Sequence, residues 1–189
     1  MQNELEAKFL SIDKEEVRVK LTSAGYTLST PEYTMRRKTF DFSKVDPGKN
    51  KWGRVRQESD KTTMTIKEVR GEGVNDTFEV ELVVNDFDIA ANFFEACNIH
   101  AKAFQENMRE VWKKDNVEVT IDTWPGLKPF IEIEGPTEES LKEASAELEF
   151  DYAIASFGSI DMIYEKELGI PASEIIKLPE ITFASVPTK

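Results

Sequence analysis

The sequence predicts an α+β fold: an antiparallel β-barrel, or a strongly curved antiparallel sheet, with helices packed outside. Two observations lead to this prediction. About eight short segments alternate apolar and polar residues, and few segments have helical periodicity. The 189 residues, 40% of them apolar, contain no repeat, linker or low-complexity stretch. One domain over 1–189 is therefore expected, with a core over about 1–170 and a C-terminal tail over about 171–189.

The first half of the chain is expected to consist mainly of strands. Asp13 and Glu16 form a capping-box pattern before the helix expected here, which ends at Gly25. Turn residues separate the remaining segments, and "DPGKNK" (46–51) is one such turn. The predicted strands are 3–10, 33–42, 52–58, 62–69 and 77–84.

The second half combines strands with acidic helices. A hairpin is predicted over 104–114 and 117–123, with its turn at Asp115-Asn116. A further strand is expected at 130–134, and a short one at "ITFA" in the tail. The predicted helices are 86–98, 138–149 and 160–168.

Charge and composition exclude several classes of protein. A net charge of −12 argues against nucleic acid and anionic membranes as partners, because both carry phosphates that the chain would repel. No apolar run is long enough to span a membrane and no signal-peptide pattern is present, so a cytoplasmic protein is expected. Cys97 and His100 are the only residues of their types, which nearly excludes zinc sites, Ser-His-Asp triads and Cys-His dyads. Cys97 is expected to be a buried structural thiol.

Charged residues share one face of most predicted strands, and apolar residues share the other. A half-solvated sheet would explain any one such strand. The signs, however, are segregated by strand, as a tunnel with an acidic wall and a basic wall would need. The residues concerned are Glu4, Glu6 and Lys8; Arg54 and Arg56; Lys67; Glu79 and Glu81; Glu118 and Asp122; and Glu132 and Glu134.

An enclosed charged face of this kind needs ligands. Hard divalent cations satisfy carboxylates, and a polyphosphate satisfies Lys and Arg, with bidentate contacts to Arg. The residues therefore indicate metal-assisted phosphoryl transfer.

The segment "ELEAK" (Glu4, Glu6, Lys8) resembles the ExExK signature of the CYTH domain, the triphosphate tunnel metalloenzyme family. That family includes class IV adenylate cyclases, thiamine triphosphatases and inorganic tripolyphosphatases. Further motifs are similar to the family's and follow its order: "RVR" (Arg54, Arg56), "TIK" (Lys67), "EVE" (Glu79, Glu81) and "IDTWPGLKPFIEIEG" (Asp122, Glu132, Glu134). In "NMR", Arg109 matches the family's K-x-R, but Asn107 stands at the Lys position.

The resemblance implies an eight-stranded antiparallel β-barrel, or tunnel, with helices packed outside. It implies that triphosphate oxygens are bound by Lys8, Arg54, Arg56, Lys67 and Arg109. It implies Mg²⁺ or Mn²⁺ ligands at Glu4, Glu6, Glu132 and Glu134, with Glu79, Glu81 and Asp122 as further ligands or as supports of the ligands. Lys8 is the catalytic candidate, either as a phosphate clamp or as a base for water.

Three functions stay open at this point. The first is a metal-dependent triphosphatase acting on inorganic tripolyphosphate, thiamine triphosphate or a nucleoside triphosphate. The second is a class IV adenylate cyclase that converts ATP to cyclic AMP and pyrophosphate, with the ribose 3′-hydroxyl in place of water. The third is a non-catalytic polyphosphate-binding module. The triphosphatase is favoured, because no segment reads as a base pocket and the His-Phe pair that precedes ExExK in class IV cyclases is absent. A monomer and a homodimer are both open.

Two smaller features have alternative interpretations. The basic run Arg36, Arg37 and Lys38 is expected on a solvated edge, with Arg36 or Lys38 reaching phosphate as the alternative. Trp52 and Trp124 are expected to pack in the fold rather than to stack on a base.

Overall fold

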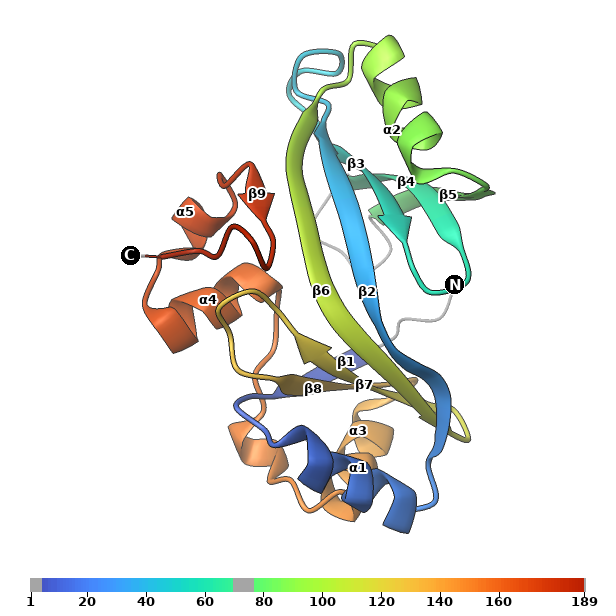
Figure 1. Ribbon diagram of the computed structural model, residues 1–189, viewed down its shortest axis with the longest axis vertical. Helices are drawn as coiled ribbons and strands as arrows, with labels where there is room; N and C mark the ends of the chain where they lie inside the picture. Colours follow the sequence, from blue (N-terminus) through green and yellow to red (C-terminus); the bar gives the residue numbers. More distant parts are fainter. Residues whose placement is uncertain (1–4, 70–76, 189) are drawn as a thin grey trace. The chain divides into compact units, whose positions relative to one another are not determined.

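The computed structural model describes residues 5–69 and 77–188. Within them the chain has an α+β fold with one large, mainly antiparallel sheet (Figure 1). The strands are β1 (Leu5–Phe9), β2 (Thr27–Asp41), β3 (Asn50–Gln57), β4 (Thr62–Val69), β5 (Thr77–Val84), β6 (Ala101–Lys114), β7 (Val117–Thr123), β8 (Phe130–Gly135) and β9 (Glu180–Ile181). The helices are α1 (Lys14–Ser23), α2 (Phe87–Ala96), α3 (Glu138–Glu147), the 3₁₀ turn η1 (Tyr152–Ile154), α4 (Ile160–Leu168) and α5 (Ala172–Ile175).

The strand order of the sheet is β1-β8-β7-β6-β2-β3-β4-β5, and β9 pairs in parallel with β6. A closed barrel requires a ladder between its first and last strands. In the described part of the chain β1 and β5 are the two ends of the order, and no ladder joins them. The expected α+β class and antiparallel sheet are confirmed, but the sheet is not closed into the expected eight-stranded barrel.

The chain forms two compact units. The first unit comprises Met1–Tyr33, Asn107–Ile175 and Pro187–Lys189, and the second comprises Thr34–Glu106 and Ile176–Val186. Two long strands take part in both, because β2 begins in the first unit and ends in the second, and β6 does the reverse. The single domain over 1–189 stays a prediction.

The first unit buries one face of β1, β7 and β8 beneath α1 and α3 (Figure 1). Asp13 caps α1 by accepting hydrogen bonds from the backbone N–H groups of Glu15 and Glu16, and Thr137 forms a capping box with Ser140 at α3. The buried residues of this core include Ala7, Phe9, Val17, Leu21, Val119, Ile121, Ile131, Ile133, Leu141 and Leu148. Because these strand residues alternate with the charged ones, the opposite face of the sheet is the charged face.

The second unit buries the corresponding face of β2 and β3 beneath α2, where Phe40 stacks on Phe94 with ring centroids 4.5 Å apart. Gly53 permits this close packing, since a Cβ atom there would lie 3.0 Å from the Phe94 ring. On β5, which forms the edge of the sheet, Val80 and Leu82 stay exposed. The core of the second unit therefore lies beneath α2.

Most element positions agree with the sequence prediction. β2, however, begins at Thr27 rather than at residue 33 and runs through Pro31. The expectation of a buried Cys97 is wrong: Cys97 follows the last residue of α2 as its C-cap, beyond the covered face, and is exposed. Among the described residues, no helix combines the length and apolar character required to cross a membrane.

Candidate functional site

The charged face of the first unit is assembled by strand register. Lys8 of β1 lies directly opposite Glu132 of β8, and Glu6 lies opposite Glu134. Arg109 of β6 lies opposite Asp122 of β7 on the same face. Because side chains alternate between faces, the apolar neighbours of these residues point to the core beneath α1 and α3. These predicted motifs thus share one surface, whereas Glu4 lies outside the described residues.

Lys8 is the most enclosed cation of this face, with an exposed fraction of 5%. Its Nζ atom donates to Oε1 of Glu6 at 2.5 Å and lies 3.8 Å from Oε2 of Glu132. The backbone of Lys8 is also fixed, through two hydrogen bonds with Ser156. The ammonium group is therefore held between two carboxylates on a rigid strand.

Glu6 and Glu132 approach closely enough to share a side-chain hydrogen bond. Burial raises the pKa of Glu132 to about 8, and the hydrogen bond with Glu6 acts in the same direction. For Glu6, burial would raise the pKa, but the hydrogen bond with Glu132 and the ammonium of Lys8 outweigh it and lower the pKa. Two neighbouring carboxylates of this kind offer hard oxygen ligands to a divalent cation, which would favour their charged forms.

The carboxylates of this face therefore suit a hard metal ion, although they do not form a complete ligand set here. Across residues 5–69 and 77–188, no group of three His, Cys, Asp or Glu side chains is arranged to hold a metal. Glu134 lies opposite Glu6 on one side and opposite Glu118 of β7 on the other. Glu134 and Glu118 thus add further carboxylates to the face that carries Glu6 and Glu132.

Asp122 has a different role, because both of its carboxylate oxygens already accept hydrogen bonds from neighbouring side chains. It is fully buried and accepts hydrogen bonds from Nε and Nη2 of Arg109 at 2.9 and 2.7 Å. Asn107 donates to it at 2.8 Å and the Thr120 hydroxyl at 3.0 Å. Burial by itself would lower the pKa of Arg109, but the charges of Asp122 and Glu132 raise it above its ordinary value. Asp122 therefore fixes the Arg109 guanidinium in its charged form.

The second unit has its own charged face, formed by β3, β4 and β5. Arg54, Thr65 and Glu81 lie in register across the three strands, and Thr65 donates to Glu81 at 2.9 Å. In the next row, Lys67 lies opposite Glu79, with Nζ and Oε2 2.9 Å apart. Glu79 and Glu81 are thus engaged by neighbours on the same sheet.

Arg54 and Arg56 are the poorly satisfied groups of this face. The Nε atom of each is buried and has no hydrogen-bond partner among the described residues. Burial lowers the pKa of Arg54 to about 10, and the positive charge of Arg56 adds to this effect. The Thr63 hydroxyl, opposite Arg56, is also buried without a partner. The Nη2 atom of Arg56 pairs with Oε1 of Glu58 at 2.8 Å, but the two buried Nε donors still suit the oxygens of an anion.

Trp52 lies on the same face. Its ring is half-buried, with the Arg54 guanidinium 6.0 Å and the Lys67 ammonium 5.7 Å from the ring centroid, and its packing in the fold rather than stacking on a base stays a prediction. Trp124 is buried in the first unit as expected. An aromatic surface beside cations can stack on a base or stabilise the cations themselves.

The sequence analysis missed Arg37. Arg37 lies opposite Arg56 in the ladder between β2 and β3, on the face that carries Arg54. Arg36 points to the other face, where its Nε bonds Oε1 of Gln57 at 2.5 Å and its guanidinium lies 4.5 Å from the Phe87 ring centroid. Lys38 shares that face, since it lies opposite Val55. Neither Arg36 nor Lys38 is therefore on the face that carries Arg54 and Arg56. The register with β3 is what distinguishes them from Arg37.

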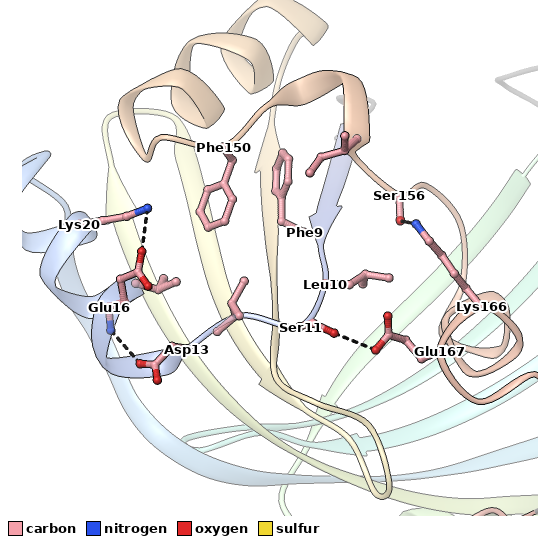
Figure 2. A pocket seen from close by; sticks show the side chains of 13 residues that line it. Phe9, Leu10, Ser11, Asp13, Glu16, Lys20, Phe150, Ser156, Lys166 and Glu167 are labelled. Carbon is pink, nitrogen blue, oxygen red and sulfur yellow. Dashed lines mark hydrogen bonds and ion pairs between the residues drawn. The ribbon is translucent and has the colours of Figure 1, made fainter.

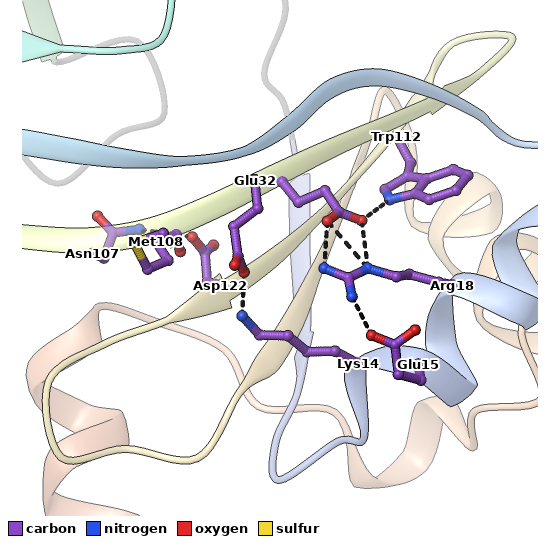
Figure 3. A network of polar contacts seen from close by, with 9 residues as sticks. Lys14, Glu15, Arg18, Glu32, Asn107, Met108, Trp112 and Asp122 are labelled. Carbon is purple, nitrogen blue, oxygen red and sulfur yellow. Dashed lines mark hydrogen bonds and ion pairs between the residues drawn. The ribbon is translucent and has the colours of Figure 1, made fainter.

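A further carboxylate, Glu110, is buried on the opposite face of β6, and Figure 3 shows the Arg18 and Trp112 side chains that contact it. Arg18 of α1 donates to it at 2.7 Å and the Trp112 indole at 2.6 Å. Burial would raise the pKa of Glu110, but these hydrogen bonds and the charge of Arg18 lower it. Glu110 is fully compensated within the fold and needs no ligand.

The order of these motifs along the chain is matched by a known family model. The CYTH-domain model matches residues 2–159, which is most of the chain. The chain belongs to the CYTH-domain family. Among curated proteins, no sequence matches this CYTH protein.

Solved structures similar to this CYTH protein have low sequence identity to it. A candidate adenylate cyclase from Vibrio parahaemolyticus is 15% identical with a TM-score of 0.68, covering 87% of this chain and 98% of that chain. A conserved hypothetical protein from Pyrococcus furiosus is 22% identical with a TM-score of 0.62, covering 82% and 95%. A candidate adenylyl cyclase from Hippeastrum, described as having a dominant triphosphatase activity, is 14% identical with a TM-score of 0.55, covering 88% and 96%. At these identities the likenesses show a shared fold.

Proposed function

We propose that this CYTH protein is a divalent-metal-dependent phosphohydrolase acting on a triphosphate compound: inorganic tripolyphosphate, thiamine triphosphate or a nucleoside triphosphate. The observation that carries the proposal is the pair of buried Nε donors of Arg54 and Arg56, which lack hydrogen-bond partners in the described structure. The Nη2 atom of Arg56 already pairs with Glu58 at 2.8 Å, so the demand that remains is for oxygen atoms that accept from the two Nε donors. A linear polyphosphate supplies several anionic oxygens to which guanidinium groups can donate in bidentate fashion.

The predicted phosphate ligands keep their roles in this proposal. Arg54, Arg56 and Lys67 bind phosphate oxygens, and Arg109, fixed by Asp122, supplies another guanidinium. Arg37 joins them as an additional phosphate ligand on the strand beside Arg56. Phosphoryl transfer develops charge on these oxygens, so donors held in place before the reaction stabilise the transition state.

The carboxylates of the first unit complete the proposal. Glu4, Glu6, Glu132 and Glu134 would hold Mg²⁺ or Mn²⁺, which neutralises phosphate charge and polarises the phosphoryl group when bound. Glu79 and Glu81 orient Lys67 and the β4 hydroxyls. Lys8 is the catalytic residue of the proposal. Its ion pairs with Glu6 and Glu132 hold the ammonium in place, which suits a phosphate clamp.

A single functional domain is part of this proposal, as is a cytoplasmic location, where magnesium and triphosphates coexist. An experimental structure with tripolyphosphate and a divalent metal would test the proposed ligands. Phosphate oxygens bound by Arg54 and Arg56 would support the proposal, and phosphate bound away from both arginines would contradict it.

One observation favours adenylate cyclase as a second candidate. The Trp52 ring lies beside Arg54 and Lys67, where an adenine could stack on it while the phosphates engage the cations. The ribose 3′-hydroxyl would then take the place of water as nucleophile. Replacing Trp52 separates the candidates, since Trp52→Ala should impair turnover of ATP much more than turnover of tripolyphosphate only if the base stacks there.

A product assay tests the proposal directly. The purified protein is incubated with Mg²⁺ or Mn²⁺ and with tripolyphosphate, thiamine triphosphate or ATP, and phosphate, pyrophosphate and cyclic AMP are separated chromatographically. Release of phosphate without cyclic AMP is expected. Cyclic AMP with pyrophosphate would establish the cyclase instead. Binding of tripolyphosphate without any product would identify a non-catalytic polyphosphate-binding module.

A further inference from the structure

A cavity of about 430 Å³ lies in the first unit, and none of the proposed metal or phosphate ligands lines it. Its walls come from the end of β1 and the segment that follows it, from α1, from the segment around η1 and from α4 (Figure 2). Its volume lies in the range of small-molecule sites, which span about 300–1,000 Å³. The cavity could therefore hold a ligand of the size of an amino acid with room for its side chain.

One part of the cavity is apolar. Phe9 and Phe150 stack with ring centroids 4.7 Å apart, and Leu10 and Ile12 line the wall beside them. Ile154 completes this part, although 68% of its surface is exposed to solvent. An exposed isoleucine next to stacked aromatic rings favours the burial of an apolar group of a ligand.

Another part of the cavity carries one charge of each sign on adjacent residues of α4. Lys166 donates from Nζ to the Ser156 hydroxyl at 2.7 Å, and Glu167 accepts a hydrogen bond from the Ser11 hydroxyl at 2.9 Å (Figure 2). In residues 5–69 and 77–188, neither charge has an ion-pair partner. Lys20, another cation of the cavity, is instead paired with Glu16 at 3.1 Å. The α4 charges are therefore the ones available to a ligand.

We propose that this cavity binds a free amino acid with a large apolar side chain. The ligand carboxylate would pair with Lys166 and accept from the Ser156 hydroxyl, and the ligand ammonium would pair with Glu167. The apolar side chain would pack on Phe9, Phe150 and Ile154. A ligand with one charge would leave either Lys166 or Glu167 unpaired, so the cavity selects a zwitterion by charge complementarity.

This site adjoins the strand that carries Lys8. The Lys8 N–H donates to the Ser156 carbonyl at 2.9 Å, and the Ser156 N–H donates to the Lys8 carbonyl at 2.8 Å. Ser156 therefore contributes its side chain to the cavity and its backbone to the position of Lys8. A bound amino acid is expected to perturb the amide resonances of Lys8 and Ser156, a readout that requires no catalytic activity.

The test uses the full-length protein with L-phenylalanine as the probe and measures affinity by isothermal titration calorimetry. Saturable 1:1 binding is expected, with shifts of the Lys8 and Ser156 amide resonances in NMR spectra. Phenylacetate, which lacks the ammonium, and phenethylamine, which lacks the carboxylate, should each bind at least about fivefold more weakly, the effect of one partly exposed ion pair. No binding of L-phenylalanine, or binding that leaves both amides unshifted, would overturn the proposal.

Two exposed substitutions assign the charges. Lys166→Gln and Glu167→Gln should each weaken L-phenylalanine binding about fivefold. Lys166→Gln should leave phenethylamine affinity unchanged, and Glu167→Gln should leave phenylacetate affinity unchanged. Lys142→Gln is the matched control, because Lys142 is an exposed lysine of α3 paired with Glu138. Equal affinity of all three variants and the wild type, with each variant melting as the wild type does, would show that the α4 charges do not bind the ligand.

Discussion

The two units build the same kind of surface but differ in how completely its charges are paired. Each has a sheet with one face buried beneath helices and one charged face. In the first unit the charges compensate one another, through the ion pair of Lys8 with Glu6 and of Arg109 with Asp122. In the second unit Lys67 is paired in the same way with Glu79, but the buried Nε of Arg54 has no partner among the described residues, and burial and the neighbouring Arg56 lower the pKa of Arg54 to about 10.

This difference indicates what each face needs. Burial and the hydrogen bond with Glu6 raise the pKa of Glu132, so a divalent metal bound by these carboxylates would stabilise their charged forms. The buried Nε donors of Arg54 and Arg56 have no partner among the described residues, so an anion would supply the missing acceptors. The following predictions test this difference between the two faces, starting with the largest expected effect.

Removing a carboxylate from the first unit should have the largest effect. Glu132→Gln is expected to lower the triphosphatase rate about 1000-fold or more, because an amide cannot supply the charge that a metal ligand provides, and about 4 kcal/mol of transition-state stabilisation would be lost. The rate is measured under saturating Mg²⁺, with circular dichroism to verify folding. Glu118→Gln, on the rim of the same face opposite Glu134, is the control and should lose less than about tenfold. Wild-type turnover by folded Glu132→Gln would remove Glu132 from the metal site.

Removing a guanidinium from the second unit should have the next largest effect. Arg54→Ala or Arg56→Ala should lower the rate about 30- to 1000-fold, as expected when a preorganised donor worth about 2–4 kcal/mol is lost. A titration of activity with Mg²⁺ should not restore either variant, because mass action cannot replace a missing guanidinium. Lys142→Ala serves as the charge-removal control. Recovery at high Mg²⁺, or a loss below about threefold, would show that these arginines act outside the phosphate site.

Arg37 and Arg36 provide a matched comparison within one strand. Arg37→Ala should reduce kcat/KM for a triphosphate about 3- to 30-fold, because it removes one charge-assisted bond from the phosphate face. Arg36→Ala should change kcat/KM less than about threefold and should instead lower the melting temperature, since it removes the contacts with Gln57 and Phe87. Steady-state kinetics and thermal melting of both variants decide the matter. The reverse pattern would mean that the strand register in solution differs from the one described.

The smallest effect concerns stability in the metal-free protein. The pKa of Glu132 is about 8 in the folded state against 4.5 as its ordinary value, so the folded state binds this proton more tightly. Its stabilising contribution is complete below about pH 4.5 and is lost as the pH rises toward 8. In chelator, Glu132→Gln should therefore gain stability over the wild type by on the order of 1 kcal/mol between pH 5 and pH 8.5. Denaturant unfolding at both pH values measures the difference in unfolding free energy. Parallel pH profiles for the two proteins would contradict the raised pKa of Glu132.

The parts of the site that follow from alternation within a strand could be predicted from the sequence. Glu6 and Lys8 alternate with Ala7 and Phe9, so their sharing of a charged face was evident from periodicity. The pairing of Lys67 with Glu79 required the register between two strands, and the same holds for the choice of Arg37 over Arg36. Register depends on turn geometry and on the whole apolar pattern, which a single strand does not contain.

The closed barrel could not be derived in the same way. Closure requires a specific stagger between the first and last strands, and this depends on the twist accumulated across the sheet rather than on any local pattern. The sequence analysis predicted a buried Cys97 for a related reason. Helical periodicity does not show at which residue a helix ends on the sheet beneath it.

The α+β class, the charged faces of the strands and the family could all be inferred from the sequence, because alternation and motif order are local or sequential properties of the chain. Which of the charges are compensated became clear from the three-dimensional structure alone. Asp122 is used up by Arg109, Asn107 and Thr120, whereas the Nε donors of Arg54 and Arg56 are left without partners in the described residues. Charge compensation depends on burial and on distances across several strands, and neither quantity can be calculated from the order of the residues.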